Sequence, residues 1–306
     1  MGTILVSGLI NIETTVQVDG FPIAYTPVRY PFFGVNASVS GVGYNVAKAL
    51  HTLGSPVRFL SLIGRDMGGR LVHDALERDG LLGTFIAAEL EQTPRSAILY
   101  DRDGQRMINL DLKDVQERAY PPALFEQAAQ GVTLAVLCNI NFSRPFLAAM
   151  QARGVPIATD VHAIGDLDSD YDRDFMAAAS ILFMSDERLP CSPEEWVRRL
   201  WNRFGTPVAV IGLGAQGALL AVRNDSFIER IPAVVTRPIV NTIGAGDALF
   251  ACFVHVYHQT GDPYEAIRKA TVFASYKIGA TGAAEGFLDA PGLDRLYAEV
   301  GLSRSG

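Results

Sequence analysis

Asn241-Thr242-Ile243-Gly244-Ala245-Gly246-Asp247 runs directly into an apolar stretch, Ala-Leu-Phe-Ala-Cys-Phe at 248–253, and this is the most informative segment of the sequence. The pattern predicts a helix at about 245–258 that is opened by small residues. A helix start presents unpaired backbone N–H groups and the positive end of the helix dipole, and glycines allow a phosphate to approach the backbone closely. The segment therefore predicts an anion hole at Gly244, Ala245 and Gly246.

Asp247 lies in the first turn of that predicted helix, beside the anion hole. A carboxylate there can accept the proton of an attacking hydroxyl while the amides hold the charge of a transferring phosphoryl group. The Gly-Ala-Gly-Asp tetrapeptide alone is equally compatible with a tight turn, because Asp is favoured near helix N-termini in any case. The rest of the chain has to decide between the two interpretations.

Composition limits the possible functions. The chain has 306 residues, of which 49% are hydrophobic and 19% charged, as in ordinary soluble globular proteins. A formal net charge of -7 leaves no basic surplus for binding nucleic acid or an anionic membrane. Three cysteines at irregular spacings fit neither a disulfide framework nor a zinc site. With no signal-peptide pattern and no apolar run of membrane-spanning length, we expect a cytoplasmic protein.

Strands and helices alternate along most of the chain, which predicts βαβ units and a mostly parallel sheet. The expected strands are 3–7, 57–63, 134–138, 156–160, 181–184, 207–211, 218–223 and 227–231. The expected helices are 44–53, 67–79, 145–152, 193–204, 245–258 and 263–278. No Pro/Gly linker divides the chain, so we expect a single domain over residues 1–306.

Two stretches depart from this alternation and predict a small β lid. Residues 12–39 are rich in Thr, Val, Tyr, Phe and Pro, which is typical of short extended strands. Residues 95–100 and 105–109 flank Asp103-Gly104, a strong hairpin signal. We expect the lid to comprise about 12–39 and 94–110.

The opening segment resembles the Asp-Thr-x-Gly-Ala-Gly-Asp signature of the ribokinase-like, or PfkB, family of sugar and nucleoside kinases, and departs from it only at Asn241. Gly41-Val42-Gly43-Tyr44-Asn45-Val46-Ala47 resembles the glycine-rich substrate segment of that family, and the similarity spans nearly the whole chain. It implies a three-layer α/β/α sandwich with a mostly parallel central sheet and a small β lid. It also implies an ATP-dependent phosphotransferase acting on a hydroxyl, expected to be primary, of a sugar or related polyol.

The resemblance further implies roles for single residues. Asp247 is the expected catalytic base, and Gly244, Ala245 and Gly246 form the anion hole. The expected substrate-binding residues are Asn11, Glu13, Gly41, Gly43, Asn45 and Asp247. The expected nucleotide-binding residues are Thr242, Gly212, Gly214, Gly217, Ser185 and Ser275. Family members usually carry Asp where Glu13 stands, which predicts an unusual substrate preference. Asp160, at the end of a predicted strand, is a further site candidate.

ATP and Mg²⁺ are the expected cofactors. The metal-associated Asn-x-x-Glu pattern of the family falls at Ser185-Asp186-Glu187-Arg188, where Ser185 and Arg188 differ from it. The metal ligands are therefore open, with Asp186 and Glu187 as candidates. Asn241 replaces an Asp that helps many relatives to hold a monovalent cation beside the anion hole. A neutral amide weakens such a site, so potassium activation is doubtful.

Gly212-Leu213-Gly214-Ala215-Gln216-Gly217 offers a rival interpretation, because it matches the Gly-x-Gly-x-x-Gly fingerprint of dinucleotide-binding folds. That fingerprint requires a following helix and an acid about 20 residues later. Instead, 218–223 and 227–231 flank Asn224-Asp225 and predict a hairpin. An NAD-dependent oxidoreductase is therefore disfavoured.

Two further alternatives stay open. One is a nucleoside kinase of the same family, because the sequence does not distinguish sugar from nucleoside substrates. The other is a catalytically weak sensor that binds a sugar or nucleoside, which the altered residues Ser185, Arg188 and Asn241 allow. The expected partners are thus small molecules, together with a homodimer through the lid, since unpaired strand edges invite pairing.

Overall fold

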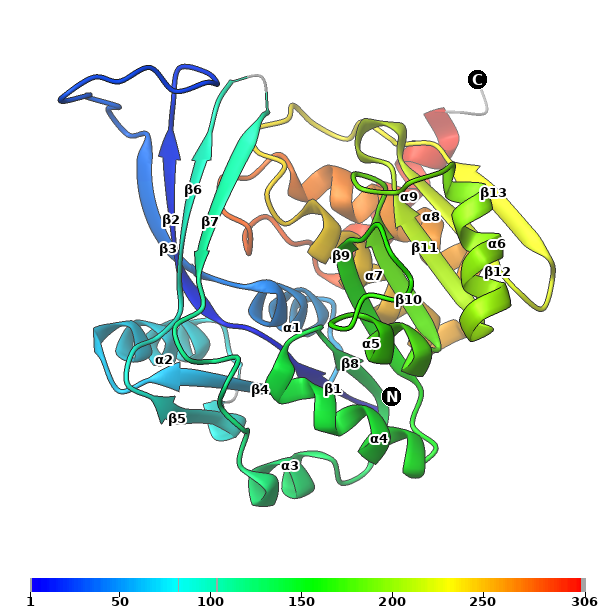
Figure 1. The fold of residues 1–306 in the computed structure, drawn as a ribbon. Coiled ribbons are helices and arrows are strands. Elements are labelled where there is room, and N and C mark those ends of the chain that lie inside the picture. Colours follow the sequence, from blue (N-terminus) through cyan, green and yellow to red (C-terminus); the bar gives the residue numbers. More distant parts are fainter. Residues whose placement is uncertain (1, 82, 103, 304–306) are drawn as a thin grey trace.

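The computed structural model describes residues 2–81, 83–102 and 104–303, and Figure 1 shows them arranged around two sheets. The strands of the larger sheet are β1 (Thr3–Ser7), β4 (Val57–Gly64), β5 (Ile86–Leu90), β8 (Val132–Leu137), β9 (Ile157–Ala163), β10 (Ile181–Ser185), β11 (Val208–Gly212), β12 (Ala218–Val222) and β13 (Phe227–Ile231). Their order is β13-β12-β11-β10-β9-β8-β1-β4-β5. Neighbours are parallel from β11 to β5, and β12 and β13 add an antiparallel edge. The predicted mostly parallel sheet is confirmed.

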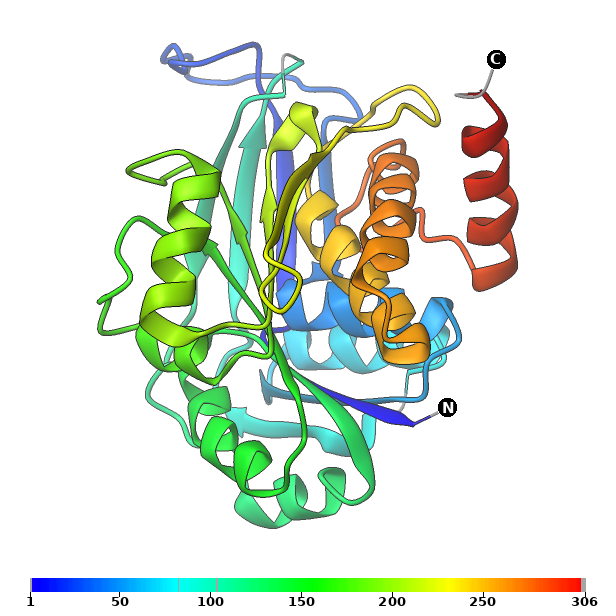
Figure 2. The ribbon, with the colours of Figure 1, turned by 90° about the vertical axis from the view of Figure 1, so that its right-hand side faces the viewer.

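Helices cover both faces of this sheet, which makes three layers (Figure 2). One face carries α1 (Val42–Thr52), α2 (Met67–Arg78), α7 (Ala245–Thr260) and α8 (Pro263–Lys277), with α9 (Ala290–Ser303) outside α8. The other face carries α3 (Pro122–Ala128), α4 (Arg144–Ala152), α5 (Arg173–Ala178) and α6 (Pro193–Phe204). Successive side chains of a strand point to opposite faces, so Ile4 and Val6 pack in one core and Leu5 in the other. The predicted α/β/α sandwich is confirmed.

The smaller sheet forms the lid and stands to one side of the larger one (Figure 1). It comprises β2 (Asn11–Gln17), β3 (Val35–Ser40), β6 (Arg95–Tyr100) and β7 (Arg106–Asp111), in the order β3-β2-β6-β7. The pair β2–β6 is parallel and the other two pairs are antiparallel. The predicted hairpin is present as β6–β7, although Asp103 of its turn lies outside the described residues.

Apolar contacts join the lid to the larger part of the molecule, since Ile12 of β2 and Val39 of β3 pack against one of its cores and β6 makes a separate contact. Ile98 of β6 is buried against Ile243 and Ala283, and the three form a small cluster of their own. Since Ile243 directly precedes the first turn of α7, the lid rests on the loop that we expect to form the anion hole.

Several elements differ from the sequence predictions. The chain contains β5, α3, α5 and α9, none of which was expected, and the lid residues 18–34 form a long loop with no strand. The fingerprint contains a single 3-10 turn, Gly214–Gln216, and its last glycine, Gly217, is followed directly by β12. This confirms that no helix begins where a dinucleotide pyrophosphate requires one. The single-domain assignment stays a prediction.

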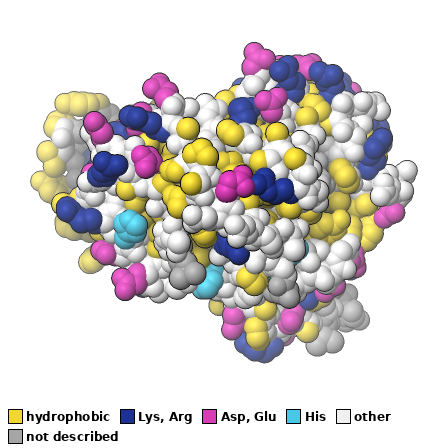
Figure 3. All heavy atoms as spheres, turned by 90° about the horizontal axis from the view of Figure 1, so that it is seen from below, with side chains coloured by type: hydrophobic (Ala, Val, Ile, Leu, Met, Phe, Trp, Pro, Cys, Tyr) yellow, Lys and Arg dark blue, Asp and Glu magenta, His cyan; other side chains and the backbone are white. Residues whose placement is uncertain are grey.

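Charges are mixed on the surface shown in Figure 3, where Lys and Arg side chains alternate with Asp and Glu. Among the described residues, no helix combines the length and apolar character that a membrane span needs.

Candidate active site

The first turns of α1 and α7 meet at the carboxyl edge of the larger sheet. Nδ2 of Asn45, in the first turn of α1, donates to Oδ2 of Asp247 at 2.6 Å. Oγ of Ser40, the last residue of β3, donates to Oδ1 of Asn45 at 3.3 Å. One chain of hydrogen bonds therefore links the lid, α1 and α7. It brings together Asn45, which the sequence assigned to substrate binding, and Asp247, which the sequence assigned to both catalysis and substrate binding.

The anion-hole loop, residues 240–246, requires glycine at one position and leaves space at another. Gly244 caps α7 in a left-handed conformation, with φ of 76°, and a Cβ there would lie 2.5 Å from the carbonyl oxygen of Ala283. A Cβ at Gly246 would meet no atom within 4 Å. Gly244 is thus required by the fold, whereas the backbone of Gly246 borders open space at a helix N-terminus. A phosphate fits beside such a backbone.

Asp247 has the electrostatic character of a base. Burial raises the pKa of its carboxyl, and the hydrogen bond from Asn45 opposes that rise. His162 and Lys277 also lower this pKa, and Asp160 raises it. A general base works best when its pKa lies near the operating pH, so a raised value suits proton abstraction from a hydroxyl.

Asn11 and Glu13 provide a polar wall on β2. They are only 3% and 5% exposed, respectively. Nδ2 of Asn11 donates to Oγ of Ser96 at 3.1 Å, but Oδ1 of Asn11 and Oε1 of Glu13 have no hydrogen-bond partner in the described part of the chain. Burial raises the pKa of Glu13, and Ser40 opposes the rise. Buried acceptors without partners are costly, and a ligand that carries hydroxyl groups satisfies them.

Gly41 and Gly43 are required by packing. A Cβ on Gly43 would lie 2.4 Å from the carbonyl carbon of Gly8, and one on Gly41 would lie 2.6 Å from the carbonyl oxygen of Leu9. Gly41 also has φ of 107°, a value that disfavours other residues. The close approach of α1 to the end of β1 thus explains both glycines, and their role in substrate binding stays a prediction.

The end of β9 adds a residue that the sequence reasoning missed. The backbone N–H of His162 donates to Oδ1 of Asp160 at 2.8 Å, and His162 has φ of 57°, in the left-handed region. Non-glycine residues held there cost free energy and cluster at functional sites. Both side chains lie close enough to Asp247 to influence its pKa. An Asp-x-His pattern after a buried strand was the one available signal.

Some of the expected nucleotide-binding residues lie at the carboxyl edge of the larger sheet, and others make structural contacts within the protein. Ser185 and Gly212 are paired at the carboxyl ends of β10 and β11, and Gly214 borders open space with φ of 55°. Gly217 is required by packing, since a Cβ there would lie 2.1 Å from the carbonyl oxygen of Ile231. Oγ of Ser275 accepts the backbone N–H of Thr236 at 3.1 Å. Ser275 therefore anchors the segment before the anion-hole loop, and the nucleotide contacts of all these residues stay predictions.

The expected metal ligands lie next to β10. No group of three or more His, Cys, Asp and Glu side chains suited to a metal occurs within the described ranges. Glu187 is exposed and lies 3.9 Å from Nη2 of Arg106, while the backbone N–H of Asp186 donates to the carbonyl oxygen of Gly212. Mg²⁺ in kinases is held mostly by phosphates and water with one or two carboxylates, so this donor set is compatible with it.

The two lid arginines behave differently. Nη1 of Arg106 reaches the carbonyl oxygen of Thr242 at 3.5 Å, at the edge of the anion-hole loop. Arg95 instead lies 3.8 Å from Asp66, the residue that caps α2. Thr242 also accepts the backbone N–H of Ala245 through its carbonyl, so its expected nucleotide contact stays a prediction.

Lys277, the last residue of α8, is a second residue that the sequence reasoning missed. It is fully buried, and its Nζ donates to the carbonyl oxygen of Ile243 in the anion-hole loop. A lysine near a helix C-terminus is favoured by the helix dipole and is usually solvated, so nothing in the sequence distinguished it.

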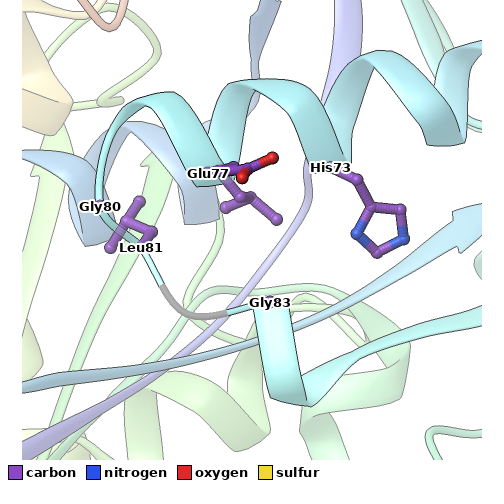
Figure 4. A pocket seen from close by; sticks show the side chains of 6 residues that line it. His73, Glu77, Gly80, Leu81 and Gly83 are labelled. Atoms are coloured by element: carbon purple, nitrogen blue, oxygen red, sulfur yellow. The ribbon is translucent and has the colours of Figure 1, made fainter.

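A separate surface pocket lies at the end of α2 (Figure 4). It is lined by His73, Leu76, Glu77, Gly80, Leu81 and Gly83. None of these residues belongs to the lid, to the first turn of α1 or to the first turn of α7. The pocket is therefore no part of the candidate site.

Comparison with known proteins agrees with this geometry. The family model described as pfkB family carbohydrate kinase matches residues 1–290. The chain is 27% identical over 298 residues to acarbose 7(IV)-phosphotransferase of an Actinoplanes species, covering 95% of the chain and 97% of that protein. It is 28% identical over 290 residues to an ATP-dependent ribose-1-phosphate kinase of Halopiger xanaduensis, covering 92% and 94%.

A solved structure agrees over the same length. The structure of the microbiome-derived acarbose kinase Mak1 superposes with a TM-score of 0.87 at 28% identity, covering 97% of the chain and 99% of Mak1.

Proposed function

The chain belongs to the pfkB family of carbohydrate kinases, and on that premise we propose that it transfers the γ-phosphoryl group of ATP to a primary hydroxyl of a neutral sugar or polyol. One observation carries the proposal. Asp247, with a raised pKa, is held by Asn45 at the N-terminus of α7, where the backbone of Gly246 borders open space. A base and an anion-binding helix end are thus combined, as phosphoryl transfer to an alcohol requires.

Each residue of the site has its own part in the phosphoryl transfer. Asp247 accepts the proton of the substrate hydroxyl as its oxygen attacks the γ-phosphorus. A new bond forms between that oxygen and phosphorus, the bond from phosphorus to the bridging oxygen breaks, and ADP leaves with the electron pair. The N–H groups of Gly244 and Gly246 and the dipole of α7 stabilise the negative charge on the transferring group, whereas the N–H of Ala245 donates to the carbonyl oxygen of Thr242 and closes the turn. Asn45 orients the carboxylate of Asp247 throughout.

Mg²⁺ supplies neutralisation of the charge on the ATP phosphates when it is bound. Asp186 and Glu187 are the candidate side chains for holding it, directly or through water, and Arg106 adds positive charge beside them. Nucleotide binding is proposed for the edge formed by Ser185, Gly212 and Gly214, at the carboxyl ends of β10 and β11.

The polar wall favours a neutral substrate. Asn11 and Glu13 offer buried acceptors for hydroxyl groups, and the acidic character of Glu13 disfavours a substrate that already carries a phosphate. Two relatives bear acarbose in their names, so acarbose joins simple sugars as a first candidate. Ribose 1-phosphate, the substrate named for another relative, is less favoured by the charge.

A nucleoside is the second candidate, but the aromatic side chains give it no support. Tyr25, Tyr30, Phe32 and Phe33 lie in the loop between β2 and β3 and are strongly exposed. Tyr30 stacks on Phe32, with ring centroids 6.3 Å apart. Figure 1 shows this loop at the end of the lid opposite the start of β2, where Asn11 and Glu13 lie. A homodimer through the lid and a cytoplasmic location remain proposals.

The test is ADP release from MgATP across a panel of sugars, acarbose, sugar phosphates and nucleosides. The proposed function predicts one neutral polyol that is turned over by the wild-type protein and not by Asp247→Asn. Turnover of nucleosides alone would establish the second candidate. ATP binding with no turnover on the whole panel would support the sensor interpretation instead.

A further inference from the structure

A buried lysine holds the anion-hole loop. Lys277 has no exposed surface, and its ammonium group donates to the carbonyl oxygen of Ile243, a neutral acceptor. Burying an ammonium is costly unless nearby charge compensates it. If Lys277 only filled space, an apolar side chain of similar size would fill it as well, without the free-energy cost of burying a charge. The location of Lys277 therefore calls for a reason that lies in its charge.

The bond to Ile243 controls the peptide that opens the anion hole. The carbonyl of Ile243 and the N–H of Gly244 belong to one planar trans peptide, in which the two groups point in opposite directions. A cation that fixes the carbonyl on the α8 side therefore directs the N–H of Gly244 away from α8. That N–H is the first of the amides expected to face the phosphoryl group.

The rest of the loop is tied to the same end of α8. The backbone N–H groups of Val240 and Asn241 both donate to the carbonyl oxygen of Ile278, and Nδ2 of Asn241 donates to the carbonyl oxygen of Thr281 at 3.1 Å. Oδ1 of Asn241 accepts the backbone N–H of Ile243 at 2.7 Å. The side chain of Asn241 is thus used within the loop. It does not supply the charged oxygen that a hard cation from solution prefers.

The surroundings of Lys277 favour a positive charge. Asp247 on α7, Glu13 on β2 and Glu285 after α8 attract the ammonium, and Arg237 before the anion-hole loop repels it. Burial lowers the pKa of Lys277 to about 8, and the three carboxylates oppose that fall. The side chain is therefore mostly charged at neutral pH and loses its charge as pH rises through about 8.

We infer that the ammonium of Lys277 is a built-in monovalent cation, which positions the anion-hole loop through the carbonyl of Ile243 and makes turnover independent of dissolved potassium. The inference rests on the proposed kinase function. Lys277 is a positioning residue, because it acts through the loop and not on the reacting groups. An ammonium and a potassium ion have the same charge and similar size. The ammonium of Lys277 beside the carbonyl of Ile243 therefore leaves no room for a potassium ion there.

The test compares the wild-type protein with Lys277→Met, which keeps most of the buried volume and removes the charge. Turnover and MgATP affinity are measured in choline chloride and in potassium or ammonium chloride. We expect wild-type turnover to be the same in all three salts. We expect Lys277→Met to lose about 100-fold in kcat in choline chloride, as for loss of one oxyanion donor, and to recover about tenfold or more in potassium or ammonium.

Lys269→Met is the matched control. Lys269 lies on the same helix but pairs with Glu265 and Asp294, away from the loop. Turnover of Lys269→Met should be the same in choline chloride and in potassium chloride. A kcat of Lys277→Met equal to that of the wild type, or a loss that no monovalent cation repairs, would overturn the inference.

A pH profile separates a positioning role from a merely structural one. Wild-type kcat should fall above pH about 8, where Lys277 loses its proton. The potassium-rescued variant should lack this alkaline fall, because potassium does not titrate. If Lys277→Met does not fold, measurements on the wild-type protein still test the inference. Strong activation of the wild type by potassium would contradict it, and so would a wild-type kcat that stays unchanged up to pH about 9.5.

The affinity measurement keeps the two proposals apart. A wild-type protein that binds MgATP but phosphorylates nothing contradicts the proposed function alone. The salt dependence of MgATP affinity in Lys277→Met then still tests the role of the lysine.

Discussion

Asn45 and Asp247 are 202 positions apart in the sequence, yet Nδ2 of the first lies 2.6 Å from Oδ2 of the second. The contact joins the first turns of two helices that begin at the same edge of the sheet. It also continues to Ser40 at the end of the lid strand β3. The position of the lid and the orientation of the proposed catalytic carboxylate are therefore coupled through one amide side chain.

Replacement of Asp247 by Asn should remove turnover and leave the nucleotide bound. The amide keeps the size of the carboxylate but cannot accept the hydroxyl proton, and loss of a general base costs about a thousandfold in kcat. ADP release measures the loss, and calorimetric titration with MgATP checks that affinity stays within about twofold. Undiminished turnover would remove Asp247 from the mechanism.

Replacement of Asn45 by Ala should move the acidic limb of the pH profile. Burial raises the pKa of Asp247, and the hydrogen bond from Asn45 stabilises the carboxylate and so lowers that pKa. Without the bond the pKa rises further. The active form is the carboxylate, so kcat falls as pH drops through this pKa. In the variant the fall should begin at a higher pH.

The matched control for Asn45→Ala is Asn109→Ala. Asn109 donates to the carbonyl oxygen of Ala97 within the lid and does not contact Asp247. Its profile of kcat against pH should coincide with that of the wild type. A shift in the control, or an unshifted profile for Asn45→Ala, would show that the limb belongs to another group.

Local patterns were sufficient to predict most of the fold. Helix α6 was expected at 193–204 and is found there, because Ser192 caps it, Pro193 begins it and Gly205 ends it in the left-handed conformation. Helix α9 was missed, since the Pro-Gly pair at 291–292, near its start, is typical of loops. The six-residue α5 is too short to show a helical period.

The site could be predicted only where its residues are contiguous. Gly244 to Asp247 stand together in the sequence, so the helix end and the base were both expected. The burial of Lys277 and the left-handed backbone of His162 depend on packing between distant segments, which no local pattern records. For the same reason, the sequence did not show that the missing side chain of Gly43 makes room for Gly8.

Two glycine substitutions should separate folding from chemistry. Gly246→Ala adds a methyl group that meets no protein atom within 4 Å, in helical backbone where Ala is well tolerated. We expect its melting temperature to be unchanged and its kcat to fall about tenfold or more, because the methyl group enters the phosphate space. Gly244→Ala should instead unfold at lower temperature, since its Cβ would lie 2.5 Å from the carbonyl oxygen of Ala283. Equal behaviour of the two variants in both assays would refute the distinction.

Replacement of Glu13 by Gln should weaken sugar binding and leave nucleotide binding intact. Oε1 of Glu13 is buried without a partner among the described residues, and a charged acceptor contributes about 1.5–3 kcal/mol to a hydrogen bond. We expect KM for the sugar to rise about tenfold to 100-fold, with KM for ATP unchanged. Glu91→Gln, at an exposed position after β5, is the control. An unchanged sugar KM for Glu13→Gln would place the substrate elsewhere.

Replacement of Ile98 by Ala should loosen the lid without unfolding the sandwich. Ile98 is buried on Ile243 and Ala283, and this cluster is separate from the two main cores. Deletion of the side chain beyond Cβ costs about 2 kcal/mol of apolar contact, which falls on lid docking because neither main core contains Ile98. We therefore expect kcat/KM for the sugar to fall about tenfold, with faster amide exchange in β6 and an unchanged melting temperature. Met107→Ala, a half-exposed neighbour on the next lid strand, should change neither quantity. If Ile98→Ala lowers the melting temperature as much as a core substitution does, the lid is not an independent element and closes by another contact.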